Sequence, residues 1–223
     1  LEIVLLQLQR ALVLAAISEG ESILSGYDSS KDVQAAMTLI QELGAKIRIE
    51  KDTLIIIGIA SIARREKISL HVGESGLLLR MIAPIASVLS FDSMITGQGT
   101  LLKRDMLSLK NNLVKNGLTI ILENNTLPIS IQGDLSKNNW QIDARDGSQL
   151  LTGLLMSLPL IGKSHKIEVS NLVSIPYIDL TLDLMEKFGV SIENQDYKLF
   201  TNLTTDFSLL ALTNSPIKPD APE

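Results

Sequence analysis

The chain has 223 residues, which allows one large domain or two small ones. It contains no cysteine, and this excludes a thiolate nucleophile, a cysteine-ligated metal and a redox dithiol. The net charge of −5 argues against a nucleic-acid binder with a basic face, and the aromatic content of 4% argues against platforms on which bases stack. A hydrophobic content of 45% is typical of a globular core.

The chain opens with a largely apolar stretch over residues 1–17. Polar side chains at Glu2, Gln7, Gln9 and Arg10 interrupt it, so the pattern fits neither a membrane span nor a signal peptide. The first residue is not Met, and the opening segment has the pattern of an ordered element. We therefore expect that the start of the natural protein is missing.

The predicted elements occur in three sets along the chain. The first set is a helix at 10–17, a strand at 22–24, a second helix that ends before Gly44, and strands at 46–50 and 53–57. The second set adds an opening strand: 68–72, then a helix at 77–87, a strand at 91–96, a helix ending before Gly117, and strands at 118–122 and 129–131. The third set has the same order: a strand at 140–143, a helix at 150–158, a strand at 166–169, a helix ending before Gly189, and strands at 190–192 and 198–200.

The second helix of each set has the same spacing of apolar residues. Gly44, Gly117 and Gly189 are 73 and 72 residues apart. Apolar residues lie four and eleven positions before each glycine, on one helical face: Ile40 and Val33, Leu113 and Met106, Met185 and Ile178. Glycine ends a helix well because the left-handed conformation costs it little. The agreement of three sets indicates a true repeat.

We therefore predict an α/β (α+β) fold of three βαβαββ units, each about 70 residues long, with pseudo-threefold symmetry. No unit can bury its helices alone, so the helices should pack inside and the sheets outside. The units cover about 1–58, 68–133 and 139–203, and the first lacks its opening strand. The proline-containing stretch 204–223 is predicted to be a tail or linker. Three unrelated α/β segments with a common spacing are the alternative.

The loops that enter the first helices are candidate anion sites. They read His71-Val72-Gly73-Glu74-Ser75-Gly76 and Arg145-Asp146-Gly147-Ser148-Gln149. A strand followed by a Gly/Ser turn and a helix start presents free N–H groups, which suit a phosphate. The alternative is ordinary helix capping by Ser75 and Ser148.

The loops before the second helices are further candidates. Lys103 and Arg104 are predicted at a helix start, where cations oppose the helix dipole, and this favours a role in binding a carboxylate or phosphate. Solvated surface charge is the alternative. In the loop before the third unit's second helix, Tyr177 could serve binding or packing.

Other chemistry has little support in the sequence. His71 and His165 are far apart without metal-ligand spacing, and Ser148 has no partners that suggest a catalytic triad. Gly97-Gln98-Gly99 lacks the pattern of a phosphate-binding loop of the Walker type.

At these loops the sequence resembles the 5-enolpyruvylshikimate-3-phosphate synthase family, the 3-phosphoshikimate carboxyvinyltransferases. The resemblance runs from about Arg10 to Leu203 and is carried by residues 172–182, 147–155, 9–16, 73–76 with Arg80, and Lys103-Arg104, where Asp105 replaces the usual Pro. It implies the enolpyruvyl transferase fold, an inside-out α/β barrel of two hinged globules with three βαβαββ units each. This chain resembles the globule that binds phosphorylated shikimate, and we expect the second globule to be absent from it.

The resemblance also implies roles for individual residues. Ser148 and Ser174 would bind the 3-phosphate of shikimate 3-phosphate, with Gly147 where the family usually has Ser. Gln149 and Tyr177 would contact the shikimate ring, and Arg10 its carboxylate. Gly76 and Arg104 would help to bind phosphoenolpyruvate, whereas Glu74 and Leu77 replace a common Asn and a common Thr.

The implied reaction transfers the enolpyruvyl group of phosphoenolpyruvate to the 5-hydroxyl of shikimate 3-phosphate and releases phosphate, as a step of aromatic amino acid biosynthesis in the cytoplasm. It requires no metal or redox cofactor, and neither nucleic acid nor a membrane is an expected partner. The family's Lys-Ser pair before the arginine corresponds to Leu5 and Leu6 here. The catalytic Asp and Lys belong to the second globule, so the isolated chain should be inactive and bind shikimate 3-phosphate weakly.

Two alternatives remain at this point. A UDP-N-acetylglucosamine enolpyruvyl transferase shares the implied fold but normally uses a catalytic Cys and lacks the Ser-x-Pro-Tyr-Ile-Asp run found at 174–179. A non-catalytic binding or scaffold descendant of the fold is favoured by Leu5, Leu6, Glu74 and the missing globule.

Overall fold

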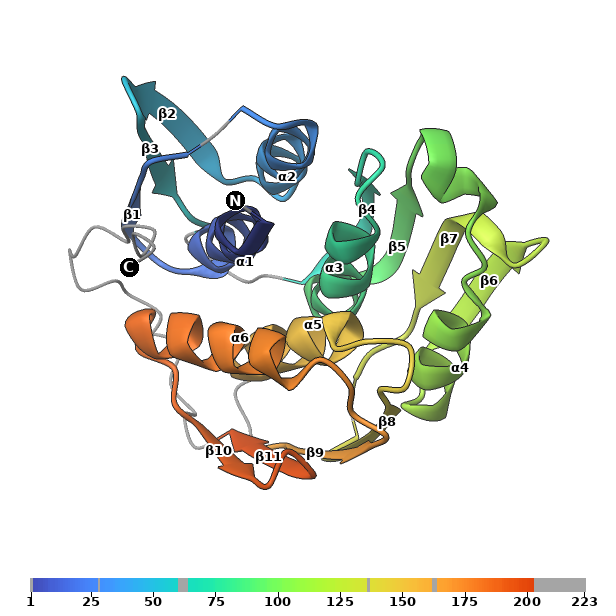
Figure 1. Cartoon of the computed structure of the whole chain (residues 1–223). Helices are drawn as coiled ribbons and strands as arrows, with labels where there is room; N and C mark the ends of the chain where they lie inside the picture. Colours follow the sequence, from blue (N-terminus) through green and yellow to red (C-terminus); the bar gives the residue numbers. More distant parts are fainter. Residues whose placement is uncertain (1, 28, 60–63, 136, 162–163, 203–223) are drawn as a thin grey trace.

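The computed structural model describes residues 2–27, 29–59, 64–135, 137–161 and 164–202, arranged as three similar units (Figure 1). The first unit contains α1 (Glu2–Ile17), β1 (Glu21–Ser25), α2 (Lys31–Glu42), β2 (Lys46–Glu50) and β3 (Thr53–Ile57). Its strands form an antiparallel sheet in the order β1-β3-β2. The described part of this unit begins with α1.

The second and third units have the complete set of elements. The second contains β4 (Arg65–His71), α3 (Gly76–Leu89), β5 (Ser90–Thr96), the 3-10 helix η1 (Gly99–Lys103), α4 (Leu107–Lys115), β6 (Thr119–Glu123) and β7 (Thr126–Gln132). The third contains β8 (Asn139–Asp143), α5 (Gln149–Ser157), the 3-10 helix η2 (Leu158–Ile161), β9 (Lys166–Ser170), α6 (Ile175–Lys187), β10 (Ile192–Gln195) and β11 (Leu199–Asn202).

The two four-stranded sheets have the same topology. Their orders are β4-β5-β7-β6 and β8-β9-β11-β10. In each sheet the opening strand runs parallel to the next strand, reached through a crossover helix, and the other pairs are antiparallel. The predicted βαβαββ repeat is therefore confirmed in its order of elements and in its strand pairing.

The helices pack in the middle and the three sheets lie around them, as predicted (Figure 1). In α1, every residue from Ala11 to Ile17 is buried, and nearly all of α3 and α5 is buried as well. Helices α3 and α5 cross closely at Gly153, where an added Cβ would overlap the main-chain oxygen of Met81 and lie 2.8 Å from Pro84 Cγ. Only glycine permits this approach.

The second helices end as the repeat predicts. The six apolar residues that define the shared face are all buried: Val33, Ile40, Met106, Leu113, Ile178 and Met185. The glycines have φ values of +104°, +102° and +77° at Gly44, Gly117 and Gly189. The residue after each glycine donates back to the helix, five positions earlier, as Val190 N does to Met185 O at 2.9 Å.

This helix ending accounts for part of a shift at the third hairpin. The prediction placed strands at 190–192 and 198–200, whereas β10 and β11 occupy Ile192–Gln195 and Leu199–Asn202. The N–H of Val190 closes the helix end and is therefore not available for a strand, which explains why β10 does not include Val190. The same bond does not explain the second residue of the shift, because β2 and β6 begin one residue after Ala45 and Leu118. At the first hairpin, β2 and β3 have the predicted bounds. Within the described part of the chain, no helix has both the length and the apolar character needed to cross a membrane.

Candidate functional site

Two loops in the third unit leave the same edge of one sheet. Strands β8 and β9 are parallel neighbours, and Asp143 at the end of β8 pairs with Ser170 at the end of β9. The loop after β8 leads to Ser148 at the start of α5, and the loop after β9 leads to Ser174 at the start of α6. Two helix N-termini, each with a serine, therefore lie side by side, and both favour negative charge.

The first of these loops leaves a serine hydroxyl without a capping role. Gly147 has φ +126°, and its N–H donates to Ala144 O at 3.2 Å. Ser148 is 3% exposed and its side chain makes no cap hydrogen bond to α5, whereas Ser75 accepts one from Leu78 N at 3.3 Å. Capping therefore accounts for Ser75 and not for Ser148. Gln149 follows in the first turn of α5 and is half-buried.

The second loop holds Ser174 in an unusual conformation. Ser174 is exposed, with φ 62° and ψ 46°, and its side chain makes no cap hydrogen bond to α6. A serine in the left-handed region carries backbone strain, which is commonest at functional positions. Tyr177 is half-buried one turn later, and its N–H donates to Ser174 O at 3.2 Å.

Arg10 lies between the first and third units. It is 1% exposed, and its Nε donates to Thr181 Oγ1 of α6 at 3.0 Å. The Thr181 hydroxyl in turn lies 3.2 Å from Thr152 Oγ1 of α5 and donates to Tyr177 O at 2.8 Å. Burial lowers the pKa of Arg10 to about 10, so the guanidinium remains charged at neutral pH. Arg10 thus places a positive charge at the helices that carry Ser148 and Ser174.

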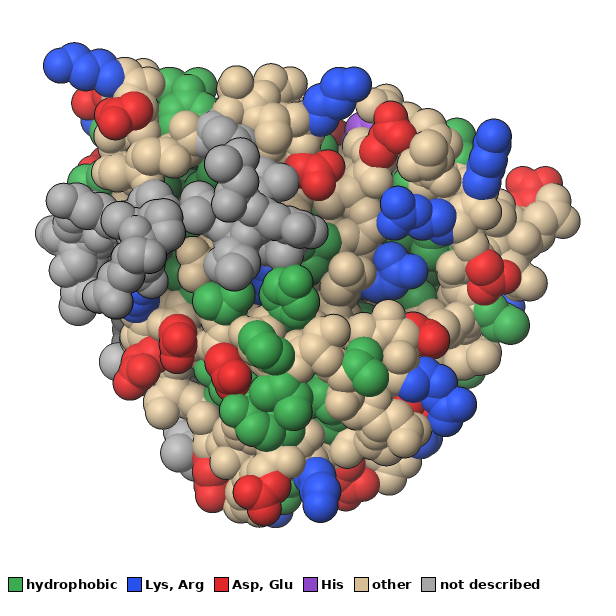
Figure 2. All heavy atoms as spheres, in the orientation of Figure 1, with side chains coloured by type: hydrophobic (Ala, Val, Ile, Leu, Met, Phe, Trp, Pro, Cys, Tyr) green, Lys and Arg blue, Asp and Glu red, His purple; other side chains and the backbone are tan. Residues whose placement is uncertain are grey.

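Two arginines meet at the start of α3. An added Cβ on Gly76 would lie 2.6 Å from Arg104 Nη1 and 3.1 Å from Arg80 Nη1. Arg80 Nη1 donates to Gly76 O at 3.1 Å, and its pKa is lowered by burial and then by the nearby Arg104, while Asp146 opposes the shift. Lys and Arg side chains also gather on this face near α3 in Figure 2. Two guanidinium groups held close together favour an anion between them.

The expected placement of Lys103 and Arg104 at a helix start is wrong. Lys103 is the last residue of η1, Arg104 follows it, and α4 begins at Leu107. Because these cations lie at the C-terminal end of a short 3-10 helix, they do not oppose a helix dipole. Asp105 Oδ1 instead accepts from Leu107 N at 2.7 Å near the start of α4.

Glu74 supports the segment that carries Arg104. Its carboxylate accepts from Thr100 N at 3.0 Å and from Thr100 Oγ1 at 3.2 Å, at the beginning of η1. The hydrogen bond from the Thr100 main chain is the main reason why the pKa of Glu74 is lowered. The sequence could not assign this role, because residues 74 and 100 belong to separate loops.

The two histidines are not grouped with the candidate site residues. His71 Nδ1 is 3.0 Å from Thr96 Oγ1 between two strands, and the ring of His165 packs at a tilt against Trp140 with ring centroids 5.4 Å apart. Among the described residues, no three His, Cys, Asp or Glu side chains are grouped to hold a metal ion. Leu5 and Leu6 lie within α1, but their side chains are outside the described residues, as is the whole segment 204–223.

Sequence reasoning missed an open groove between the second and third units, which is lined mostly by polar residues. Its volume is about 540 Å³, and α4 and the end of β8 form its walls: Asp105, Leu107, Ser108, Asn111, Asn112, Lys115, Asp143, Arg145 and Asp146. Asn112 and Asn116, four residues apart on α4, bond to the main chain of β8. The repeat could have revealed these two asparagines. The equivalent positions of the first and third units are apolar, namely Leu39, Leu43, Leu184 and Phe188, so a polar residue there indicates a special contact.

Comparison with known proteins identifies the family. A family model described as EPSP synthase (3-phosphoshikimate 1-carboxyvinyltransferase) matches residues 7–221. The chain belongs to the EPSP synthase family. The family resemblance stated from the sequence is therefore confirmed.

Relatives from several bacteria agree with the family assignment. The 3-phosphoshikimate 1-carboxyvinyltransferase of Clostridium perfringens (strain SM101) is 36% identical over 192 residues, which are 86% of this chain and 45% of that protein. The enzyme of the same name from Escherichia coli (strain SMS-3-5) is 34% identical over 197 residues, 86% of this chain and 46% of that protein. The chain thus spans about half the length of the curated relatives that it matches.

Solved structures support the fold. EPSP synthase from Acinetobacter baumannii superimposes with a TM-score of 0.75 at 22% identity, covering 95% of this chain and 47% of that protein. The enolpyruvyl transferase NikO from Streptomyces tendae gives a TM-score of 0.61 at 12% identity, covering 96% of this chain and 49% of that protein. At these identities the likeness concerns the fold alone.

Proposed function

We propose that this chain is the part of an enolpyruvyl transferase that binds shikimate 3-phosphate. The complete enzyme would transfer the enolpyruvyl group of phosphoenolpyruvate to the 5-hydroxyl of shikimate 3-phosphate and release phosphate. One observation carries the proposal: the parallel strands β8 and β9 bring Ser148 and Ser174 to adjacent helix N-termini. Membership of the EPSP synthase family supports the choice of substrates.

Ser148 and Ser174, with the N–H groups of the first turn of α5, would hold the 3-phosphate. Gln149 and Tyr177 would contact the shikimate ring from the first turns of α5 and α6. Arg10 would contribute its buried positive charge toward the shikimate carboxylate. Gly76 and Arg104 would hold phosphoenolpyruvate, and the proximity of Arg80 to Gly76 adds a second guanidinium there.

These residues would bind and orient two polyanions, which is the main requirement of the reaction. The 5-hydroxyl adds to C2 of phosphoenolpyruvate and phosphate is then eliminated, so charge must be neutralised locally and the reactants aligned. The family resemblance implies that the groups that transfer protons, an Asp and a Lys, belong to a second globule of the same protein. Closure of two globules would exclude water.

The test is phosphate release from phosphoenolpyruvate in the presence of shikimate 3-phosphate. The full-length gene product should release phosphate, and the 223-residue chain alone should not, at any concentration of either substrate. Turnover by the isolated chain would contradict the need for a second globule. If the full-length product binds shikimate 3-phosphate but releases no phosphate, the non-catalytic alternative is favoured instead.

A further inference from the structure

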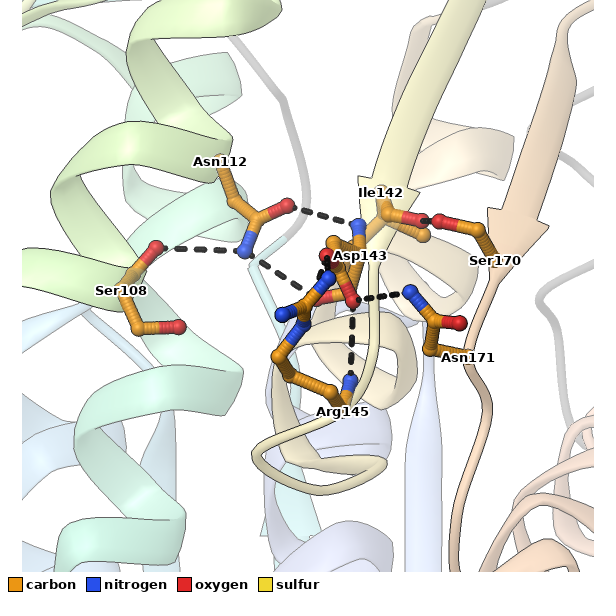
Figure 3. Close-up of polar contacts among 7 residues, drawn as sticks. All are labelled: Ser108, Asn112, Ile142, Asp143, Arg145, Ser170 and Asn171. Atoms are coloured by element: carbon orange, nitrogen blue, oxygen red, sulfur yellow. Dashed lines mark hydrogen bonds and ion pairs between the residues drawn. The ribbon is translucent and has the colours of Figure 1, made fainter.

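The carboxylate of Asp143 connects the two loops that carry Ser148 and Ser174 (Figure 3). On one side it accepts from Arg145 N at 3.2 Å and Arg145 Nε at 2.8 Å, and it forms an ion pair with Arg145 Nη2 at 2.7 Å. On the other side it accepts from Asn171 Nδ2 at 3.1 Å. Arg145 belongs to the loop before α5 and Asn171 to the loop before α6, so one side chain joins both.

The main chain of Asp143 is itself fixed from both sides. On the free edge of β8, Asn112 Oδ1 accepts from Asp143 N at 2.8 Å and Asn112 Nδ2 donates to Asp143 O at 3.2 Å. Asn116 makes the same pair of bonds to Gln141 N at 2.9 Å and Gln141 O at 2.8 Å. On the other edge β8 pairs with β9. Hydrogen bonds at both edges of β8 therefore hold the main chain of Asp143, and this fixes where its carboxylate begins.

The loop after β9 has a strained backbone that contacts from outside the loop can stabilise. It contains two left-handed non-glycine residues, Asn171 with φ 53° and Ser174 with φ 62°. Each costs conformational energy, so a loop of this shape persists only when its surroundings hold it. Hydrogen bonding of the Asn171 amide to Asp143 supplies this support three residues before Ser174.

The charge of Asp143 is compatible with a nearby phosphate. Hydrogen bonds from Arg145 and then from Asn171 lower the pKa of Asp143 to about 2, so its carboxylate is ionised at neutral pH. An unpaired carboxylate near the loops would repel an incoming dianion, but the ion pair with Arg145 neutralises it. Asp143 is thus suited to organise the phosphate-binding loops without touching the phosphate.

We infer that Asp143 is a positioning residue that sets the distance between the Ser148 and Ser174 hydroxyls by tying the loop 144–148 to the loop 171–174. The inference rests on the proposed function. By holding both loops before the substrate arrives, Asp143 removes the cost of ordering them on binding. Its loss should weaken the binding of shikimate 3-phosphate even though none of the binding groups has changed.

The test combines amide hydrogen exchange of the free 223-residue chain with calorimetric titration by shikimate 3-phosphate. Asp143→Ala should speed exchange in both loops and raise the Kd about tenfold. Asn171→Ala should speed exchange in 171–174 and leave 144–148 protected. Asp143→Asn should retain much of the protection, because the amide oxygen still accepts from Asn171.

The matched control is Glu50→Ala on β2. Glu50, like Asp143, forms an ion pair with an arginine two residues away, in this case Arg48. Glu50→Ala should change neither the exchange rates of the two loops nor the Kd.

The inference is overturned if Asp143→Ala leaves exchange in 171–174 unchanged. It is also overturned if exchange rises equally throughout β8–β11, because Asp143 would then stabilise the whole sheet rather than position two loops. The exchange measurement needs no ligand. If the unaltered chain fails to bind shikimate 3-phosphate, the proposed function fails, while the exchange pattern still decides whether Asp143 couples the loops.

Discussion

At the scale of single residues, the most informative feature is the burial of the positively charged Arg10 side chain. Its guanidinium is buried, and its Nε contacts a hydroxyl, Thr181 Oγ1, which also bonds to main chain of α6. Burying a cation costs free energy unless hydrogen bonds or an ion pair compensate it, so a buried charge is weak evidence for a stabilising role. We propose that Arg10 supplies positive charge beneath the proposed site, and the alternative is a purely structural role.

Replacement of Arg10 separates these two explanations. Arg10→Met should weaken the binding of shikimate 3-phosphate at least tenfold, which corresponds to about 1.4 kcal/mol, because the buried positive charge is lost. The free energy of unfolding should change by less than ~2 kcal/mol in either direction. Calorimetric titration and urea unfolding measure the two effects, with Arg48→Met as the exposed-arginine control. A large loss of stability with unchanged affinity would show that Arg10 is structural.

The sequence could predict individual site residues only in part. The roles of Ser148 and Ser174 came from the family resemblance, and the parallel pairing of β8 with β9 brings these residues near each other. Arg80 contributes to the same cationic cluster as Arg104, but the two are 24 residues apart in sequence and meet only over the backbone of Gly76. Contacts of this kind depend on how α3 packs, which no local pattern encodes.

At the scale of elements, the repeat predicted most of the fold. The apolar spacing and the glycine stops predicted three amphipathic helices, and all six defining side chains are buried. Strand positions were less accurate at the third hairpin, where the prediction included Val190 although its N–H closes the helix end. The asparagine contacts from α4 to β8 could not be predicted from propensity, because an asparagine that completes a sheet edge depends on the neighbouring unit.

The crossing of α3 and α5 is a further element-scale feature that can be tested. Gly153→Ala should lower the free energy of unfolding by about 1–3 kcal/mol, because the added methyl group would overlap the main-chain oxygen of Met81 and force the helices apart. Denaturant unfolding measures this change. Asn111→Ala, at an exposed position of α4, is the control and should stay within about 0.5 kcal/mol of the unaltered chain. Equal stability of the two variants would mean that the helices separate at little cost.

At the scale of the whole molecule, we propose that the three units contribute different parts of one binding site. The first unit provides Arg10, the second provides Gly76, Arg80 and Arg104, and the third provides both serine loops. The chain carries a net charge of −5, so binding of the two proposed anionic substrates would depend on this local grouping of cations rather than on overall charge. The fold therefore supports a binding function, and the curated relatives are about twice as long.

The most direct test of this account is calorimetric titration of the 223-residue chain with shikimate 3-phosphate, beside the double variant Ser148→Ala, Ser174→Ala. We predict weak binding that the double variant loses by roughly a hundredfold, because each hydrogen bond to a charged group contributes about 1.5 kcal/mol. Unphosphorylated shikimate should bind both proteins equally poorly. A control with two exposed serines replaced, Ser69→Ala and Ser191→Ala, should bind as the unaltered chain does. Equal affinity of the chain and the Ser148, Ser174 double variant, or no binding at millimolar ligand, would contradict the assignment of the phosphate site.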